Sequence, residues 1–276
     1  MNKFFKKITF GLLLASGMIM LSGCSNSSNN NADHTFKVGM ECAYAPFNWL
    51  QPSETNDAVK ISGGWYACGY DVYMAKEIAQ KLGKKLEIIK IDWDGLLPAL
   101  SSGKIDAIIA GMSATPERKK TMDFTDNYYN SNVVIVVRKD SQYAGATGLS
   151  DFEGACLTGQ LGTVHYGFID QIKNVHKAVA MEDVSSMVSA VSSGKVDGYV
   201  SEKPAAMVVS QTNTSLTYID FAPNSGFEFS QDDVAIAIGI KKGSSLRDDI
   251  NGALEKISQK SRDDLMDKSV RASKIS

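Results

Sequence analysis

Two stretches of the chain, Ala99–Ile109 (ALSSGKIDAII) and Ala190–Val200 (AVSSGKVDGYV), share the pattern A-x-S-S-G-K-[IV]-D at a distance of 91 residues. Each copy has the composition of a helix end, followed by a glycine of the kind that terminates helices and then by an apolar strand. The upstream residues match as well, because a strand, an acidic turn and a helix precede both copies. The repeat predicts two similar α/β lobes rather than a chance match between two helix–strand connections.

Around the first copy, segments of strand and helix character alternate. The segment 70–82 (YDVYMAKEIAQKL) has the apolar spacing of a helix and stops at Gly83, a residue that commonly follows a helix. Alternation of this kind is typical of a parallel sheet with helices on its faces. The expected strands are Phe36–Met40, Leu86–Ile91 and Ile105–Ile109, and the expected helices are Tyr70–Leu82 and Gly95–Ser102.

The two lobes are expected to form one cleft. In open α/β sheets, ligands bind beyond the carboxyl ends of the strands, so two facing lobes bring those ends together. We expect lobe 1 to comprise residues 35–129 plus 234–276 and lobe 2 residues 133–228, with hinges near 130–132 and 229–233 that allow closure on a ligand. The segments directly after the expected strands are Glu41–Tyr44, Asp92–Trp93, Ala110–Ser113, Gly159–Thr163 and Ser201–Glu202.

The first 23 residues have the organisation of a lipoprotein signal peptide. Lysines 3, 6 and 7 form a positive n-region, and the apolar run over 8–21 is shorter than the ~20 residues that span a bilayer. The run ends in LSGC (21–24), which resembles the bacterial lipobox, where the cysteine thiol accepts a lipid. We therefore expect lipidation of Cys24, a flexible polar tether over 24–34, and an extracytoplasmic protein anchored to the cell membrane.

Composition narrows the range of partners and cofactors. Beyond residue 23 the chain has 26 Lys and Arg and 31 Asp and Glu, a net charge of −5, and no basic run, so nucleic acid is not an expected partner. Besides Cys24, the chain has three cysteines, Cys42, Cys68 and Cys156, so they cannot all pair with one another. Either Cys42 and Cys68 form a disulfide, or all three are free thiols. With three histidines and no metal-ligand spacing, we expect no metal and no other cofactor.

The expected cleft segments contain the groups that a free α-amino acid requires. Its carboxylate needs an arginine and backbone N–H groups, and its ammonium needs a carboxylate. In 113–118 (SATPER), Thr115 and Pro116 have the character of a helix start, which places Arg118 in the first turn, where a bound carboxylate would offset the unfavourable helix dipole. Glu202, just after the second copy, is suited to meet the ammonium from the opposite lobe. The alternative for both Arg118 and Glu202 is a charged side chain on the solvent-exposed surface with no ligand.

Four segments carry a family resemblance: VGMECAYAPFNW (38–49), GYDVYMAKEIAQKLG (69–83), WDGLLPALSSGKIDAIIAGMSATPERKKTMDFTDNYY (93–129) and SSGKVDGYVSEKPAA (192–206). Taken together, they resemble the bacterial extracellular solute-binding proteins of family 3, the substrate-binding lipoproteins of polar amino-acid ABC transporters, over residues 35–276. The resemblance implies an α/β, two-lobed periplasmic-binding-protein type II fold, in which each lobe is a mostly parallel sheet flanked by helices. It also implies a free amino acid as the ligand in the cleft, an ABC permease in the membrane as the partner, and a monomer.

The resemblance also implies a role for individual cleft residues. Glu202 stands where many members have Asp, and the stretch 51–66 is longer than in many relatives. The implied roles are Tyr44 and Trp93 as aromatic walls, Ala110 and Gly111 as carbonyl acceptors for the ammonium, Ser113 as a hydroxyl bridging both ends of the ligand, Arg118 as the carboxylate clamp, Thr163 as a backbone donor to that carboxylate, and Glu202 as the partner of the ammonium.

Glu41, at the end of the first expected strand, bears on the choice of ligand. The matching position is acidic in relatives that resemble arginine- and lysine/arginine/ornithine-binding proteins, and a buried carboxylate without a partner is costly. We therefore expect a cationic amino acid: arginine, lysine or histidine. Relatives that resemble cystine-binding proteins also carry Glu here, so cystine or a neutral polar amino acid stays open.

Two other function classes compete with the binding-protein interpretation. A same-fold enzyme of cyclohexadienyl dehydratase type is one, although the chain has no nucleophile elbow or metal set, and only His165 lies near the 159–163 loop. A chemosensory receptor domain is the other. We expect no catalytic residues and a transport function.

Overall fold

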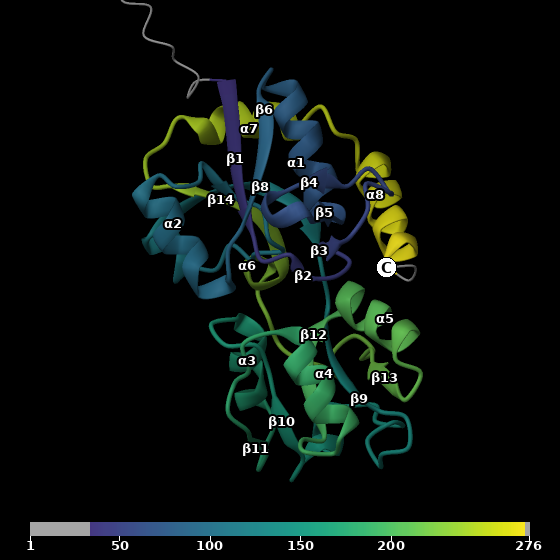
Figure 1. Ribbon diagram of the computed structural model, residues 1–276. Helices are drawn as coiled ribbons and strands as arrows, with labels where there is room; N and C mark the ends of the chain where they lie inside the picture. Colours follow the sequence, from purple (N-terminus) through teal and green to yellow (C-terminus); the bar gives the residue numbers. More distant parts are fainter. Residues whose placement is uncertain (1–33, 274–276) are drawn as a thin grey trace, which may run out of the picture. The chain divides into compact units, whose positions relative to one another are not determined.

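The computed structural model of the protein describes residues 34–273, which form two five-stranded sheets and one four-stranded sheet (Figure 1). The predicted signal peptide, the lipidation of Cys24 and the tether up to residue 33 fall outside the described residues. No helix within 34–273 has the length and apolar character needed to cross a membrane. The first sheet consists of β6 (Lys85–Lys90), β1 (Thr35–Met40), β7 (Ala107–Ile108), β14 (Ala235–Lys241) and β8 (Met122–Asn130), and the second of β11 (His176–Lys177), β10 (Cys156–Thr158), β12 (Gly198–Glu202), β9 (Val133–Arg138) and β13 (Leu216–Ile219), each in that spatial order.

The two sheets share one topology. In the first, β1 runs parallel to β6 and β7, while β14 runs antiparallel to β7 and β8. In the second, β10 runs parallel to β11 and β12, while β9 runs antiparallel to β12 and β13. Each sheet therefore has three adjacent parallel strands followed by an antiparallel pair. We call the sheets with their helices the first and second lobes; their exact boundaries stay a prediction.

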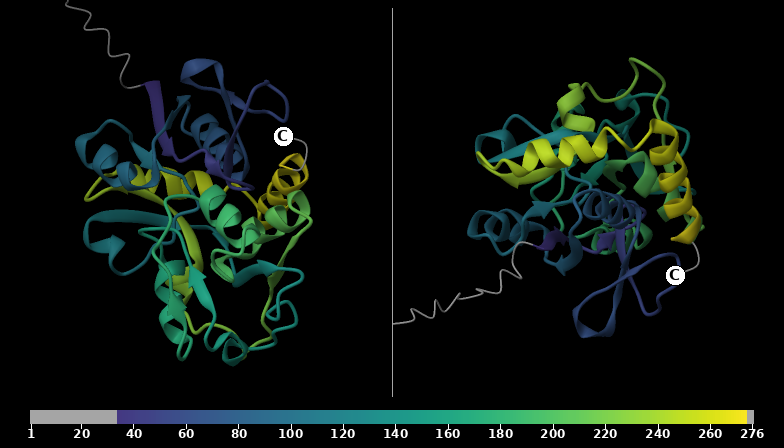
Figure 2. Two further views of the ribbon diagram at one scale, coloured as in Figure 1. Left: turned by 60° about the horizontal axis from the view of Figure 1, so that its bottom comes forward. Right: turned by 90° about the horizontal axis from the view of Figure 1, so that it is seen from above.

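Helices accompany each sheet, as the alternating pattern predicted. α1 begins directly after Gly69 and ends before Gly83, whose φ of +65° is favourable for glycine. α8 contacts both α1 of the first lobe and α5 of the second (Figure 2). The helices are α1 (Tyr70–Lys81), α2 (Leu96–Ser102), α3 (Val164–Phe168), α4 (Val184–Ser192), α5 (Lys203–Thr212), α6 (Gln231–Val234), α7 (Leu246–Leu254) and α8 (Gln259–Ala272), and the 3₁₀ helices are η2 (Ser62–Gly64), η3 (Trp93–Gly95), η4 (Arg118–Lys120), η5 (Leu149–Phe152) and η6 (Ile169–Gln171).

The sequence repeat corresponds to a repeated hydrogen-bond pattern. Gly103 after α2 and Gly194 after α4 both have a left-handed φ, of +77° and +74°. The repeat aspartates then make the same two hydrogen bonds. The Asp106 N–H donates to the Lys37 carbonyl and the Asp106 carboxylate accepts the Lys37 N–H, and Asp197 makes the same two bonds with the backbone of Cys156, all at 2.8 Å. The shared S-S-G-K-[IV]-D pattern therefore caps a helix and ties the next strand to a central strand in both lobes.

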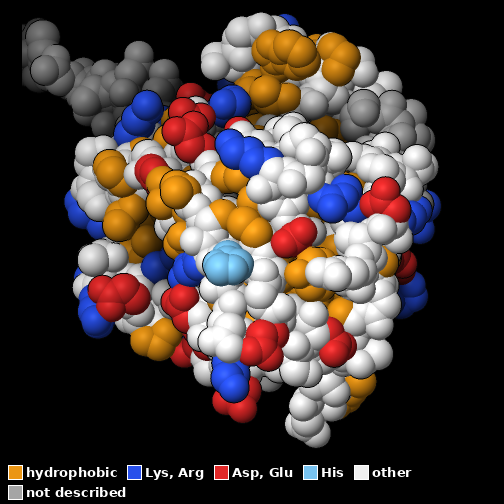
Figure 3. Space-filling model, turned by 90° about the horizontal axis from the view of Figure 1, so that it is seen from below, with side chains coloured by type: hydrophobic (Ala, Val, Ile, Leu, Met, Phe, Trp, Pro, Cys, Tyr) orange, Lys and Arg blue, Asp and Glu red, His pale blue; other side chains and the backbone are white. Residues whose placement is uncertain are grey.

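Each lobe has its own apolar core. In β9 (VVIVVR) all valines and isoleucines are buried, because alternate side chains pack into clusters on opposite faces of the second sheet. The first lobe's core contains β1, β14 and the apolar face of α1. On the face shown in Figure 3, Lys and Arg side chains are intermixed with Asp and Glu rather than gathered into one patch.

The chain passes twice between the lobes, and the two crossovers lie side by side. The first joins β8 to β9 through Ser131 and Asn132, and the second reaches β14 through α6. Ser131 N–H donates to the Val234 carbonyl at 3.1 Å, directly next to the pairing of Asn130 with Ala235.

The segment 51–66 lies within a small antiparallel sheet. β3 (Asn48–Gln51) pairs with β5 (Tyr66–Cys68), and β4 (Val59–Lys60) pairs with the other edge of β5. Cys42, Cys68 and Cys156 are free thiols in the structure, so Cys42 and Cys68 form no disulfide. The strands are β2 (Ala43–Tyr44), β3 (Asn48–Gln51), β5 (Tyr66–Cys68) and β4 (Val59–Lys60).

Candidate functional site

A small pocket, with a cavity volume of about 20 Å³, lies where loops that follow strands of both lobes meet. This volume is well below the usual range for small-molecule sites, so the lining side chains nearly fill the pocket. Every segment selected by the carboxyl-end rule contributes to the lining. The lining residues are Glu41, Tyr44, Trp93, Gly111, Ser113, Arg118, Gln160, Thr163, Val164, His165 and Glu202.

Arg118 is a half-buried cation with no carboxylate partner within residues 34–273. Its Nη1 donates to the Ser113 carbonyl at 2.9 Å and its Nη2 to the Gly162 carbonyl at 3.1 Å, while the guanidinium carbon lies 5.2 Å from the centre of the Trp93 ring. Burial lowers the pKa of Arg118 to about 10, so it stays charged at neutral pH. The pocket therefore holds a positive charge that a bound carboxylate would neutralise.

The local structure around Arg118 follows the predicted helix start. Thr115 Oγ1 accepts the Arg118 N–H at 3.3 Å, and the Thr115 carbonyl accepts the Lys119 N–H at 3.0 Å. The helical segment is shorter than a full helix, because η4 covers three residues before β8 begins.

Glu202 and Tyr44 meet across the two lobes. The Tyr44 hydroxyl donates to Glu202 Oε1. Glu202 Oε2 is buried and has no well-formed hydrogen bond within the described chain, although the Ser131 hydroxyl is near enough to favour its charged form. Burial outweighs these contacts and raises the pKa of Glu202 to about 7. A cationic group in the pocket would satisfy the free oxygen and stabilise the charge.

Glu41 is a second buried carboxylate, with 7% of its surface exposed. Gln160 Nε2 lies 3.2 and 3.4 Å from its two oxygens and also donates to the Glu182 carbonyl at 3.0 Å. Burial, and to a smaller extent Asp183 and Asp92, raise the pKa of Glu41 to about 7, while Gln160 and Lys90 act in the opposite direction. Its partner within the described residues is thus one neutral amide.

Two glycines allow the close approaches that shape the pocket. Gly111 has a φ of +60°, and a Cβ there would lie 3.2 Å from the Tyr44 ring. Gly162 has a φ of +71°, and a Cβ there would lie 3.3 Å from Trp93 Nε1 in the other lobe. Larger residues at either position would strain the backbone and press on an aromatic wall.

A buried network supports the first-lobe side of the pocket. Asp71, at the start of α1, accepts the Asn48 amide at 2.7 Å and the Tyr128 hydroxyl at 2.6 Å. Asn48 in turn accepts the N–H of Cys42 at 2.7 Å, and Cys42 has a φ of +57°, which is uncommon outside glycine. The network holds the loop that presents Glu41 and Tyr44, and it has no signal in the sequence because its members are far apart along the chain.

The structure brings the predicted cleft residues together, with one exception and three additions. Ala110 is buried but does not line the pocket. Thr163 lines it, and its N–H already donates to the Gln160 carbonyl at 3.3 Å. The pocket is also lined by Gln160, Val164 and His165. The only sequence signal for these residues is that they follow an expected strand, on a loop or at the start of a helix.

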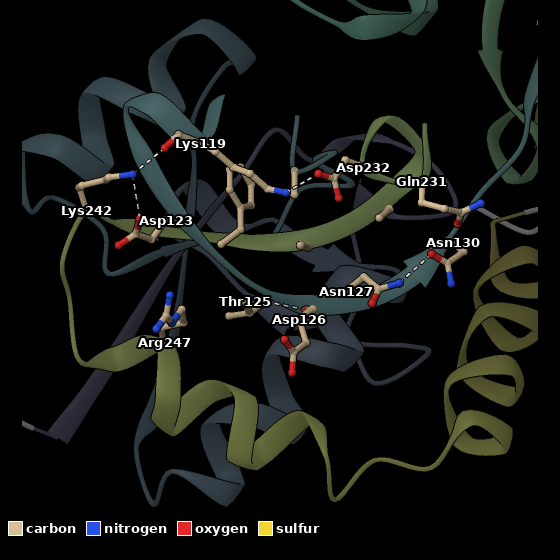
Figure 4. Close-up of a pocket in the computed structure, with 14 residues that line it drawn as sticks. Lys119, Asp123, Thr125, Asp126, Asn127, Asn130, Gln231, Asp232, Lys242 and Arg247 are labelled. Atoms are coloured by element: carbon tan, nitrogen blue, oxygen red, sulfur yellow. Dashed lines mark hydrogen bonds and ion pairs between the residues drawn. The ribbon is translucent and has the colours of Figure 1, made fainter. Parts of the chain in front are cut away.

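A larger polar cavity lies along β8 and β14 (Figure 4). Its charged side chains are largely paired with one another: Lys119 with Asp232 at 2.6 Å, and Lys242 with Asp123 at 3.1 Å. The Lys119–Asp232 pair joins the residue after Arg118 to α6, in the second crossover. This cavity therefore has less uncompensated charge for a ligand than the pocket between the lobes.

Burial of the Glu41 carboxyl group is expected to affect the free energy of unfolding in a pH-dependent way. Folding raises the pKa of the Glu41 carboxyl group from 4.5 to about 7. At pH values above 4.5, where the group is ionised in the unfolded chain, this shift lowers the free energy of unfolding. At low pH the group is protonated in both states, and the effect vanishes. Glu41→Gln is therefore expected to raise the free energy of unfolding of the ligand-free protein by about 3 kcal/mol at pH 8 and to change it little at pH 4. Urea unfolding followed by tryptophan fluorescence would measure this, with exposed Glu54→Gln as the control. An equal effect at both pH values would show that ionisation of Glu41 is not its cause.

These features define a class of protein: a two-lobed α/β binding protein whose ligand pocket lies between the lobes and contains one arginine and two buried glutamates. The chain belongs to the bacterial extracellular solute-binding proteins, family 3, whose model matches residues 36–270. The relatives described below are named as binding proteins rather than enzymes.

Similar proteins are known from sequence and from structure. A "probable histidine-binding protein" of Campylobacter jejuni is 32% identical over 82% of this chain and 86% of its own length. The arginine-binding extracellular protein ArtP of Bacillus subtilis is 29% identical over 89% and 91%. Among solved structures, an ancestral arginine-binding protein bound to arginine is 32% identical, covers 85% of this chain and 97% of its own, and superposes with a TM-score of 0.69. A substrate-binding protein of an amino-acid ABC transporter is 30% identical over 86% and 99%, with a TM-score of 0.71.

Proposed function

We propose that the protein captures a cationic amino acid outside the cell and delivers it to an ABC permease, without catalysing a reaction. The observation that carries this proposal is the charge arrangement in the pocket. Arg118 lacks an anion within the described chain, and two buried glutamates lack cations. A zwitterion with one additional positive charge would complement all three groups.

The charges suggest one orientation for the ligand. Arg118 binds the α-carboxylate in this orientation, and Ser113 and Thr163 line the same pocket. Glu202 binds the α-ammonium through its free oxygen, with Tyr44 and Trp93 on either side of the ligand. Ala110, which is buried and does not line the pocket, would contribute through its backbone alone.

The side chain of the ligand would then point toward Glu41. Glu41 also lines a second cavity that opens beside the pocket, together with Asp92, Asp94, Glu182 and Asp183. Within the described residues these carboxylates form no group suited to a metal ion. They create a negative potential at this end of the site, which favours a guanidinium, ammonium or imidazolium group. Relatives named for arginine and histidine support the same choice.

A thermal-shift screen of the purified protein against all common amino acids tests this function. Specific binding raises the melting temperature in proportion to the logarithm of the ligand concentration once the site is saturated. Arginine, lysine or histidine should give the largest shifts. If no free amino acid raises the melting temperature, the proposed function is wrong.

We also propose that the protein is a monomer held at the outer face of the membrane by a lipid on Cys24, with lobes of residues 35–129 plus 234–276 and 133–228. The adjacent crossovers at 130–132 and 229–233 would serve as hinges. Small-angle scattering that is unchanged by saturating ligand would count against closure.

Cys24→Ala is expected to release the protein from membranes, because a thiol is required for lipid attachment. The wild type should enter the detergent phase of a Triton X-114 partition and incorporate labelled palmitate, and the variant should do neither. Cys156→Ala, which changes a half-buried cysteine, is the matched control. A Cys24→Ala variant that stays in the detergent phase would exclude this anchor.

A further inference from the structure

His165 is a pocket residue whose imidazole has no assigned partner. It is the second residue of α3, it lines the same pocket as Arg118, and it is half-buried. Its ring lies 6.4 Å from the Phe168 ring in an edge contact, and its imidazole nitrogens make no hydrogen bond within residues 34–273. Imidazole nitrogens in protein interiors usually have such a partner.

We propose that His165 donates a hydrogen bond to the carboxylate of the bound amino acid from the second lobe, while Arg118 binds the same carboxylate from the first. This inference rests on the proposed function. A carboxylate has two oxygens and accepts several hydrogen bonds, so both donors can be satisfied at once. Two residues from different lobes would then contact one anion, which links carboxylate recognition to closure.

The charges around His165 give this contact a pH dependence. Burial and the neighbouring Arg118 lower the pKa of His165 to about 4, so the ring is neutral in the empty pocket near pH 7. Tyr44, Glu41 and Glu202 are the other titratable groups lining the pocket. A carboxylate between His165 and Arg118 would offset the repulsion and raise the pKa of His165. Binding at pH 5.5 should therefore be accompanied by proton uptake at His165.

Two substitutions separate hydrogen bonding from packing. His165→Phe keeps a ring against Phe168 but removes the donor, and His165→Gln keeps a donor that cannot be protonated. Titration calorimetry with L-arginine should show about tenfold weaker binding for His165→Phe at pH 7.5 and a larger loss at pH 5.5. His165→Gln should lose no more than about threefold at pH 7.5 and about tenfold at pH 5.5. His176→Gln, at an exposed position in the same lobe, should match the wild type at both pH values.

Proton uptake provides a measurement that a packing role would not change. Calorimetry at pH 5.5 in buffers of different ionisation enthalpy should show that the wild type takes up about half a proton more than His165→Gln on binding. Wild-type affinity and proton uptake in His165→Phe would overturn the role of His165 while leaving the proposed function intact. A wild type that binds no amino acid in the thermal-shift screen would overturn both.

Discussion

Replacing Arg118 with alanine is expected to weaken amino-acid binding by at least about 20-fold while leaving the fold intact. Removing one partner of a buried, hydrogen-bonded charge pair costs about 2–5 kcal/mol, and each 1.4 kcal/mol corresponds to about tenfold in affinity. The protein's own bonds to Arg118 go to the carbonyls of Ser113 and Gly162. The side chain is therefore not part of an ion pair that stabilises the fold within the described chain.

Calorimetry on Arg118→Ala and Lys120→Ala tests this expectation. Lys120 belongs to the same 3₁₀ helix but is exposed and paired with Glu117, and exposed pairs contribute little. Lys120→Ala should therefore bind like the wild type. Circular dichroism would establish that both variants are folded. Near wild-type affinity in folded Arg118→Ala would remove Arg118 from the site.

Glu202→Gln is expected to cause the second large loss, of at least about 20-fold. The amide keeps the shape of the side chain and an acceptor for the Tyr44 hydroxyl, but it loses the negative charge that would face the ammonium. Glu202 has 1% of its surface exposed, so solvent screens that interaction only weakly. The change should act on affinity and should not lower stability, because burial of the charge is itself costly.

The exposed Glu153 of the same lobe offers a matched control, Glu153→Gln. The wild type should also lose affinity for a cationic ligand below about pH 7, since protonation of Glu202 and Glu41 removes both negative charges. Glu202→Gln should show a weaker pH dependence in this range. If its affinity and pH profile match those of the wild type, the ammonium binds elsewhere.

Much of the fold could be predicted because the same local signals occur twice. The glycine and aspartate of the repeat make matching backbone bonds in both lobes, so one pattern reported two helix–strand connections. Boundaries were less accurate: β7 covers only Ala107–Ile108, and α2 is preceded by a 3₁₀ turn at Trp93–Gly95. The ends of a strand depend on its pairing with neighbouring strands. Because those strands are distant in the sequence, a local pattern cannot predict where the strand ends.

The carboxyl-end rule located the candidate site, since it depends on topology alone. The contacts that cross the pocket could not be predicted in this way. Tyr44 and Glu202 are 158 residues apart, and Glu41 and Gln160 are 119 apart. His165 had no periodic or motif signal of its own, because a single histidine at a helix start is compatible with many roles.

We propose that the pocket selects a cationic amino acid through Glu41. The most direct measurement is titration calorimetry at pH 7.5 that compares L-arginine, L-lysine and L-histidine with L-glutamine, L-glutamate and L-cystine, in the wild type and in Glu41→Gln. We predict that a cationic amino acid binds at least about tenfold more tightly than any other in the wild type, equivalent to 1.4 kcal/mol, and that Glu41→Gln reduces this preference. Tightest binding of glutamine, glutamate or cystine, or an unchanged ranking in Glu41→Gln, would contradict the claim.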